Sequence, residues 1–181
     1  GNLATAVLIL TAFSVIGWII SWVIPPVSSA APDKPRNLNP LEDLKQNLAL
    51  AWNDRVLWLA IWGNTFFWFL CGLLYTNIPV FGLEKFHLKD MELGTLTVSL
   101  AIGIGIGSYL AGHLSGSKIE YGLIPLGSIF ISLFSIDLGL FVNTYYRAIF
   151  AVSFLGLGAG FFAVPINALI QHRPDFKAKG G

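Results

Sequence analysis

Five long apolar runs are the feature that most limits what this sequence can fold into. A bilayer core about 30 Å thick requires roughly 20 apolar residues per helix, and each run reaches that length. Only 12% of the residues are charged, against about 25% in soluble domains, which is too little polar material to coat a water-soluble fold. We expect an all-α integral membrane protein with five transmembrane helices, at about residues 3–24 (within segment 1–24), 56–80, 93–114, 121–142 and 148–170.

The basic residues between these runs predict an orientation. The connecting segments alternate between the two sides of the membrane, and basic residues concentrate on the cytoplasmic side. We therefore expect the N-terminus outside and the C-terminus in the cytoplasm. Chain ends on opposite sides favour a fragment of a longer protein, and a complete five-helix protein is the alternative. The cytoplasmic set is Lys34, Arg36, Lys45, Arg55, Lys118, Arg173, Lys177 and Lys179, and the external set is Lys85, Lys89 and Arg147.

Residues 25–55 form the only long polar connection. Its first half is rich in proline, serine and alanine, which predicts an extended linker. Asn39, Pro40 and Glu42 then supply an N-cap residue, a proline at the first helical position and an acid at the third. We expect a cytoplasmic linker with an amphipathic helix at about 40–54 lying on the membrane surface. A helix that only joins two halves of the protein is the alternative.

Small residues form stripes on two of the predicted helices. The repeat of Gly103, Gly105 and Gly107 is no phosphate loop, because it lies inside one apolar helix rather than between a strand and a helix. Small residues on a helix face allow close approach of a neighbouring backbone, and Pro165 should bend its helix near Phe161. We expect packing or gating contacts, with static packing as the alternative, at Gly105, Ser108 and Gly112 beside Ala101, at Gly103, Gly107 and Ala111, and at Gly156, Gly160, Ala163, Pro165 and Asn167.

A few polar and aromatic side chains within the runs are candidates for substrate contact. Asp137 is the only acid inside a predicted span, and it either serves a proton, cation or polar substrate or reaches interfacial water. Asn64 and Asn167 either line a central cavity or hydrogen-bond a neighbouring helix. Trp68 lies deeper than an interfacial aromatic belt requires, so it either faces lipid or forms the wall of a cavity for a hydrophobic substrate.

Catalytic and metal-binding patterns are weak. His113 and Ser115 are two residues apart on a helix and do not face each other, so they form no triad with Asp137. The histidines show no metal-ligand spacing, and Cys71 has no basic neighbour in the sequence to activate it. The net charge of +1 excludes a strongly basic nucleic-acid-binding protein. We expect no catalytic residue, metal or cofactor in this segment.

Several longer motifs resemble the major facilitator superfamily. The proline-rich loop leading to "NP", the helix ending "WNDR" and the aromatic "FWFL" are similar to the middle of such a transporter. "YLAGHLSGSKIEYGLIPLG" is similar to the end of that fold's eighth helix and the loop after it, and "GLGAGFFAVPINALIQHRP" to its tenth helix. The resemblance makes the five spans helices six to ten of twelve, a partial bundle. In the loop motif a glycine, Gly116, replaces the usual acid, which leaves Lys118 and Glu120 as the charges that would meet neighbouring loops.

Within that superfamily, "SGSKIEYGLIPLG" and "PINALIQ" resemble the lysophospholipid transporter branch, including forms fused to a phospholipid acyltransferase and an acyl-ligase domain. The resemblance implies a secondary transporter that moves lysophospholipid or a related amphiphile across the bacterial inner membrane by alternating access. Its partners would be the lipid bilayer, the amphiphilic substrate and the missing transmembrane helices of the same protein. The alternatives are a proton-coupled drug or small-solute exporter, the membrane portion of a bifunctional acyltransferase, and a membrane scaffold.

Overall fold

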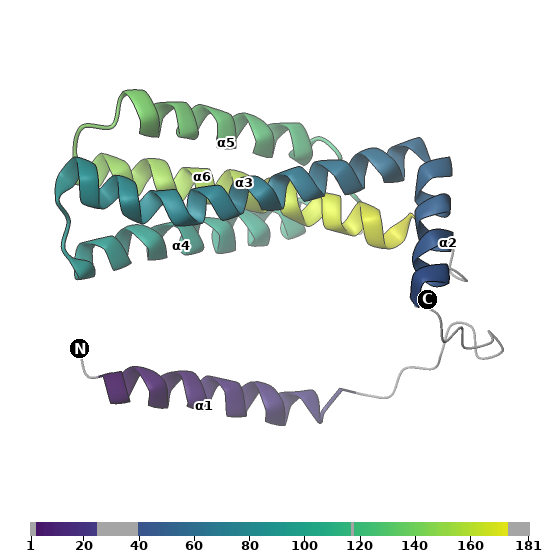
Figure 1. The fold of residues 1–181 in the computed structure, drawn as a ribbon, viewed down its shortest axis with the longest axis horizontal. Helices are drawn as coiled ribbons and strands as arrows, with labels where there is room; N and C mark the ends of the chain where they lie inside the picture. Colours follow the sequence, from purple (N-terminus) through teal and green to yellow (C-terminus); the bar gives the residue numbers. More distant parts are fainter. Residues whose placement is uncertain (1–2, 25–39, 117, 174–181) are drawn as a thin grey trace. The chain divides into compact units, whose positions relative to one another are not determined.

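The computed structural model describes residues 3–24, 40–116 and 118–173, and these form helices without strands (Figure 1). Five of the six helices are long and apolar enough to cross a membrane, which confirms the all-α membrane fold class. The predicted linker before the second helix, residues 25–39, lies outside the described residues. The helices are α1 (Leu3–Ser21), α2 (Pro40–Asn53), α3 (Arg55–Phe86), α4 (Asp90–Ser115), α5 (Leu123–Leu140) and α6 (Tyr145–His172).

Helix α1 belongs to a unit separate from the one that contains α2–α6. It is apolar all round, and the side chains described along it are exposed. The hydroxyls of Thr11 and Ser14 donate to the carbonyl oxygens of Val7 and Leu10 in the preceding turn. These bonds satisfy the polar groups inside the helix, which suits a helix surrounded by lipid.

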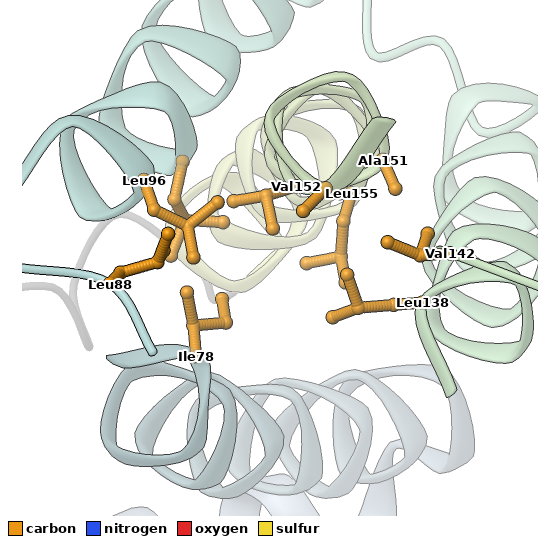
Figure 2. Close-up of a cluster of buried hydrophobic side chains, with 10 residues drawn as sticks. Ile78, Leu88, Leu96, Leu138, Val142, Ala151, Val152 and Leu155 are labelled. Atoms are coloured by element: carbon orange, nitrogen blue, oxygen red, sulfur yellow. The ribbon is translucent and has the colours of Figure 1, made fainter. Parts of the chain in front are cut away.

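Helix α6 is the centre of the second unit. In its most apolar window 56% of the residues are buried, a larger share than in any other candidate span. Helices α4 and α5 flank α6, and α3 crosses over it (Figure 1). At the end of this bundle remote from α2, four helices share one apolar cluster that includes Ile78, Leu96, Leu138 and Leu155 (Figure 2). We call this the far end of the bundle and the opposite one the α2 end.

The close contact between α4 and α6 is made through glycines on both helices. A side chain on Gly103 or Gly107 would collide with the backbone of α6 at Ser153 or Leu157. In return, a side chain on Gly156 or Gly160 would collide with the backbone of α4. Small residues therefore let these two backbones touch, as helices in lipid often do.

Only one of the two predicted stripes of small residues on α4 contacts α6. A methyl group added to Gly105 or Gly112 would meet no atom of a neighbouring helix within 4 Å, among the described residues. The stripe of Gly103, Gly107 and Ala111 is buried instead. The face with Gly105 and Gly112 has no neighbour in the described part of the chain, so the prediction that these glycines make packing or gating contacts stays a prediction.

Helix α3 is longer than the sequence pattern predicts. The helix includes Pro79 and continues past residue 80 to Phe86. Its C-cap residue, His87, adopts a left-handed backbone conformation. The backbone N–H of His87 donates to the carbonyl oxygen of Leu83, which closes the last turn. The adjacent charged residues Glu84 and Lys85 are typical of a loop in the sequence, but both are helical and exposed in this last turn. Helix α4 likewise begins early, at Asp90, where the Glu92 carboxylate accepts from the Lys89 backbone N–H.

Helix α2 joins α3 at Asp54, which is the N-cap of α3. Trp52 of α2 meets Trp58 of α3 edge to face, with 4.7 Å between the ring centroids. In Figure 1 α2 runs across the end of the α3–α6 bundle rather than along it. The exposed Leu48 and Trp52 lie on one side of α2, and the position of this helix on the membrane surface stays a prediction.

Candidate functional site

An apolar cavity of about 380 Å³ lies between the middle of α3 and the middle of α6. Helix α3 supplies aromatic side chains, including the half-exposed Trp68, and α6 supplies small ones. Side chains of α4 and α5 also line it. The lining includes Phe67, Trp68, Cys71 and Tyr75 of α3, Leu155, Ala159 and Ala163 of α6, Leu100 and Ile104 of α4, and Ile131 of α5.

The cavity exists because α3 contacts different helices at its two ends. Towards the α2 end, Gly63 packs on Ile166 of α6, and Phe67 stacks on Phe162 with 5.0 Å between the ring centroids. Towards the far end, Gly82 lies against Leu93 of α4. The cavity lies between these two contacts, with α3 on one side and α6 on the other.

Asn64 and Asn167 lie beyond the same end of this cavity, on facing helices, and neither lines it. Asn64 precedes Phe67 and Trp68 by one turn of α3, and Asn167 follows Ala163 by one turn of α6. The Asn167 side-chain amide donates to the Ala163 carbonyl oxygen at 2.9 Å, so this donor is satisfied within its own helix. The side-chain oxygen of Asn64 is buried and accepts no hydrogen bond within the described part of the chain.

Asp137 is not part of the cavity. Its carboxylate accepts a hydrogen bond from Arg147 Nη2 at 2.6 Å and forms an ion pair with it at the far end of the bundle. Asp137 lies in the last turn of α5, and Arg147 in the first turn of α6. The short α5–α6 connection places a guanidinium beside its carboxylate, and a role of Asp137 in substrate contact in the intact protein stays a prediction.

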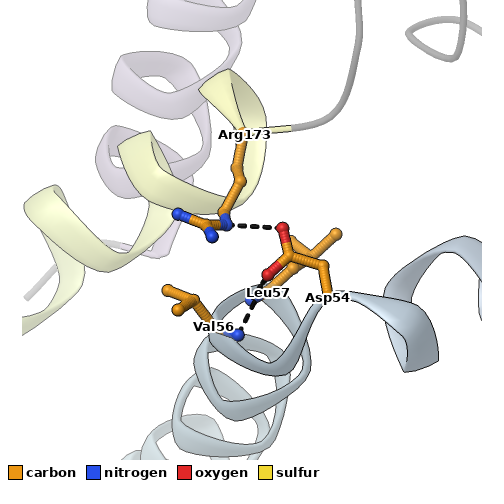
Figure 3. Close-up of polar contacts among 4 residues, drawn as sticks. All are labelled: Asp54, Val56, Leu57 and Arg173. Atoms are coloured by element: carbon orange, nitrogen blue, oxygen red, sulfur yellow. Dashed lines mark hydrogen bonds and ion pairs between the residues drawn. The ribbon is translucent and has the colours of Figure 1, made fainter.

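A second ion pair, which the sequence does not predict, lies at the α2 end. Asp54 accepts hydrogen bonds from the backbone N–H groups of Val56 and Leu57, and Arg173 Nε donates to its other oxygen at 2.5 Å (Figure 3). The hydrogen bond from Arg173 is the main reason why the pKa of Asp54 lies below its usual value. The pair joins the start of α3 to the end of α6. The two residues are 119 positions apart, so no local sequence pattern reveals the contact.

The residues considered for catalysis do not come together. His113 stacks on Tyr109 of its own helix, whereas Asp137 bonds Arg147 at the far end. No group of three or more histidine, cysteine, aspartate or glutamate side chains suitable for a metal ion occurs among residues 3–24, 40–116 and 118–173. The cavity between α3 and α6 is lined mainly by apolar side chains, and neither His113 nor Asp137 lines it.

Comparison with known proteins decides the family. The profile of the Major Facilitator Superfamily matches residues 2–180. This chain belongs to the Major Facilitator Superfamily. In this superfamily member, the loop residues Lys118 and Glu120 are exposed, and their predicted contact with neighbouring loops stays a prediction.

Curated relatives of this superfamily member include bacterial proteins named lysophospholipid transporter LplT. The protein of Photorhabdus laumondii is 27% identical over 179 residues, covering 94% of this chain and 43% of the relative. Those of Yersinia pestis (strain Pestoides F) and Yersinia pseudotuberculosis (strain YPIII) are 29% identical over 140 residues, covering 73% of this chain and 32% of each relative. The chain thus spans less than half the length of these relatives. No solved structure matches it.

Proposed function

We propose that the intact protein is a secondary transporter for lysophospholipid or a related single-chain amphiphile in the bacterial inner membrane. The observation that carries this proposal is the apolar cavity between α3 and α6, which has an aromatic wall at Phe67 and Trp68, with the amide of Asn64 one helical turn beyond that wall. Apolar pockets with a few placed polar groups suit ligands of that type. The names of the relatives point to the same substrate class.

The proposed mechanism is alternating access between two helical bundles. Helices α3–α6 form a close-packed unit through the glycine contact of α4 with α6, and such a unit can move as one body. The small face of α4 at Gly105 and Gly112 is open in this segment. We propose that further helices of the intact transporter pack on this face and slide against it.

The proposed orientation follows from the distribution of basic residues. It places the α2 end, with Asp54 and Arg173, in the cytoplasm, and the far end, with Asp137 and Arg147, outside. Asn64 then lies on the cytoplasmic side of the cavity. A cysteine introduced at position 120, in the exposed α4–α5 loop, should react with an impermeant maleimide only after the cytoplasmic face is opened.

Transport of labelled lipid in proteoliposomes tests the proposal. The intact protein should move an acyl-labelled lysophosphatidylethanolamine between leaflets faster than empty liposomes do, and residues 1–181 alone should not. A cationic drug serves as the competing substrate. Preferential movement of the drug would support the exporter alternative and contradict the lysophospholipid proposal.

A further inference from the structure

The side-chain oxygen of Asn64 is one of two buried side-chain polar atoms that have no hydrogen-bond partner in the described part of the chain; the other, Ser115 Oγ, lies in the last turn of α4. Leaving a buried acceptor unpaired is unfavourable, and more so in an apolar environment. Two other polar side chains of α3 donate hydrogen bonds within the helix. Thr65 donates to the Ile61 carbonyl, and Asn77 donates to the Leu73 carbonyl at 2.7 Å. Asn64 is therefore the polar group in α3 that requires an external partner.

The position of Asn64 restricts what that partner can be. Ala60, Asn64, Phe67 and Cys71 follow one another at helical spacing, so they share the face of α3 that lies over α6. Ala60 is buried against Ile166 and Leu169 of α6, which closes this face towards the α2 end. Phe67 and Cys71 line the cavity in the other direction. The buried Asn64 oxygen thus lies one helical turn before the first cavity-lining residues of α3, and the cavity is the nearest open space along this face.

A ligand that fits both features needs a hydrogen-bond donor next to an apolar chain. The Asn64 oxygen accepts a hydrogen bond and cannot donate one, and the cavity lining offers few polar groups to compete for the donor. A lysophospholipid carries a free glycerol hydroxyl close to its single acyl chain. A phospholipid with two acyl chains lacks this hydroxyl, because it is esterified.

We propose that Asn64 is a specificity-determining residue whose side-chain oxygen accepts a hydrogen bond from the free glycerol hydroxyl of the lipid while the acyl chain occupies the cavity. This inference rests on the proposed transport function. It assigns to one amide the distinction between a lipid with one acyl chain and a lipid with two. Sites that hydrogen-bond a ligand hydroxyl discriminate strongly against an analogue without it, because the site's polar group then remains unpaired.

The experiment uses the intact transporter in proteoliposomes and two probes, lysophosphatidylethanolamine and its analogue in which hydrogen replaces the glycerol hydroxyl. The wild type should move the hydroxyl lipid about tenfold more efficiently, in rate divided by half-saturating concentration, as expected for one lost hydrogen bond. Asn64→Leu and Asn64→Ala should remove this difference. Asn77→Leu is the matched control on the same helix and should keep the full discrimination.

The possible outcomes separate this inference from the function on which it rests. If the wild type moves neither lipid, the proposed function is wrong. If it moves both equally well, or if the Asn64 variants still discriminate, the function stands and the role of Asn64 is wrong. If Asn64→Ala loses transport of both lipids equally, or if neither Asn64 variant folds, Asn64 bonds another helix. Either result overturns the inference.

Discussion

Gly107 of α4 and Leu157 of α6 are in direct backbone contact. A methyl group on Gly107 would lie 2.8 Å from the α-carbon of Leu157 and would also collide with its carbonyl oxygen. The obstacle is main chain and not a flexible side chain, so it cannot rotate away. This contact requires glycine and fixes how closely the two central helices approach.

We expect Gly107→Ala to destabilise the intact protein. Overpacking a close contact costs about 1–3 kcal/mol, and sometimes more, because the helices must separate along their whole interface. Thermal unfolding in detergent, followed by loss of the monodisperse peak in size-exclusion chromatography, measures the change. Gly103→Ala should have a similar effect, since its side chain would meet the Ser153 carbonyl.

Gly105→Ala is the matched control, because a side chain there has open space in this segment. We expect unfolding at or slightly above the wild-type temperature, since alanine favours helix over glycine. A loss as large as that of Gly107→Ala would contradict the assignment of the two faces. Larger variants, Gly105→Leu and Gly112→Leu, then test movement. Normal folding with lost transport supports a sliding contact with further helices, and loss of both supports static packing.

The glycines also show how far the sequence alone predicts this fold. Their spacing defines two faces of small residues on α4, and the length and apolar composition of the five runs predict the transmembrane helices. Spacing cannot tell which face meets α6, because that depends on the matching glycines Gly156 and Gly160 and on the path of the chain between the helices. The sequence pattern ends α3 too early for a related reason: Glu84 and Lys85 are charged, yet they lie on an exposed helical surface.

The candidate site is only partly predictable. Trp68 is recognisable by its depth in the span, and it lines the cavity. The polarity of Asn64 is visible in the sequence, but its unpaired oxygen is not. Ion pairs are the least predictable feature. Asp137 pairs with Arg147 across the α5–α6 turn, and Asp54 pairs with Arg173, which is 119 residues away in the sequence. Such partners are determined by the packing of whole helices.

The Asp137–Arg147 pair leads to a prediction about coupling. Because its carboxylate pairs with Arg147 and Asp137 does not line the cavity, Asp137→Asn should retain transport. The pair is partly exposed, so its coupling energy in a double-mutant cycle with Arg147→Gln should be about 1 kcal/mol or less. Loss of transport in a normally folded Asp137→Asn protein would contradict this and favour a proton-coupled mechanism.

The Asp54–Arg173 pair should make stability depend on pH in the acid range. The pKa of Asp54 is lowered in the folded protein, so its contribution is fully present above the unfolded value of about 3.9. The contribution is lost as the pH falls through the lower, folded value. Asp54→Asn keeps an N-cap residue and removes only the charge, so its unfolding temperature should lie below that of the wild type at pH 7.

The difference between Asp54→Asn and the wild type should shrink as the pH approaches 3, in melting curves recorded from pH 7 downwards. Arg173→Gln should reproduce the effect at pH 7. Glu120→Gln is the control, since Glu120 is exposed in a loop at the same end of the bundle and should leave the melting temperature unchanged at every pH. A pH-independent difference for Asp54→Asn would show that the helix cap, and not the ion pair, is what stabilises this end.

Trp68→Ala tests whether the cavity holds an acyl chain. Trp68 lines the cavity, whereas Trp62, six residues earlier on α3, is exposed and contacts Trp58. Removing the indole of Trp68 takes away apolar contact area, and at about 25 cal/mol per Å² the loss should raise the half-saturating concentration of a long-chain lysolipid about tenfold or more. A short-chain lysolipid should be affected less, because less of its chain reaches the indole. Trp62→Ala should leave the half-saturating concentrations of both lysolipids unchanged. Equal effects of the two substitutions at every chain length would mean that the acyl chain binds elsewhere.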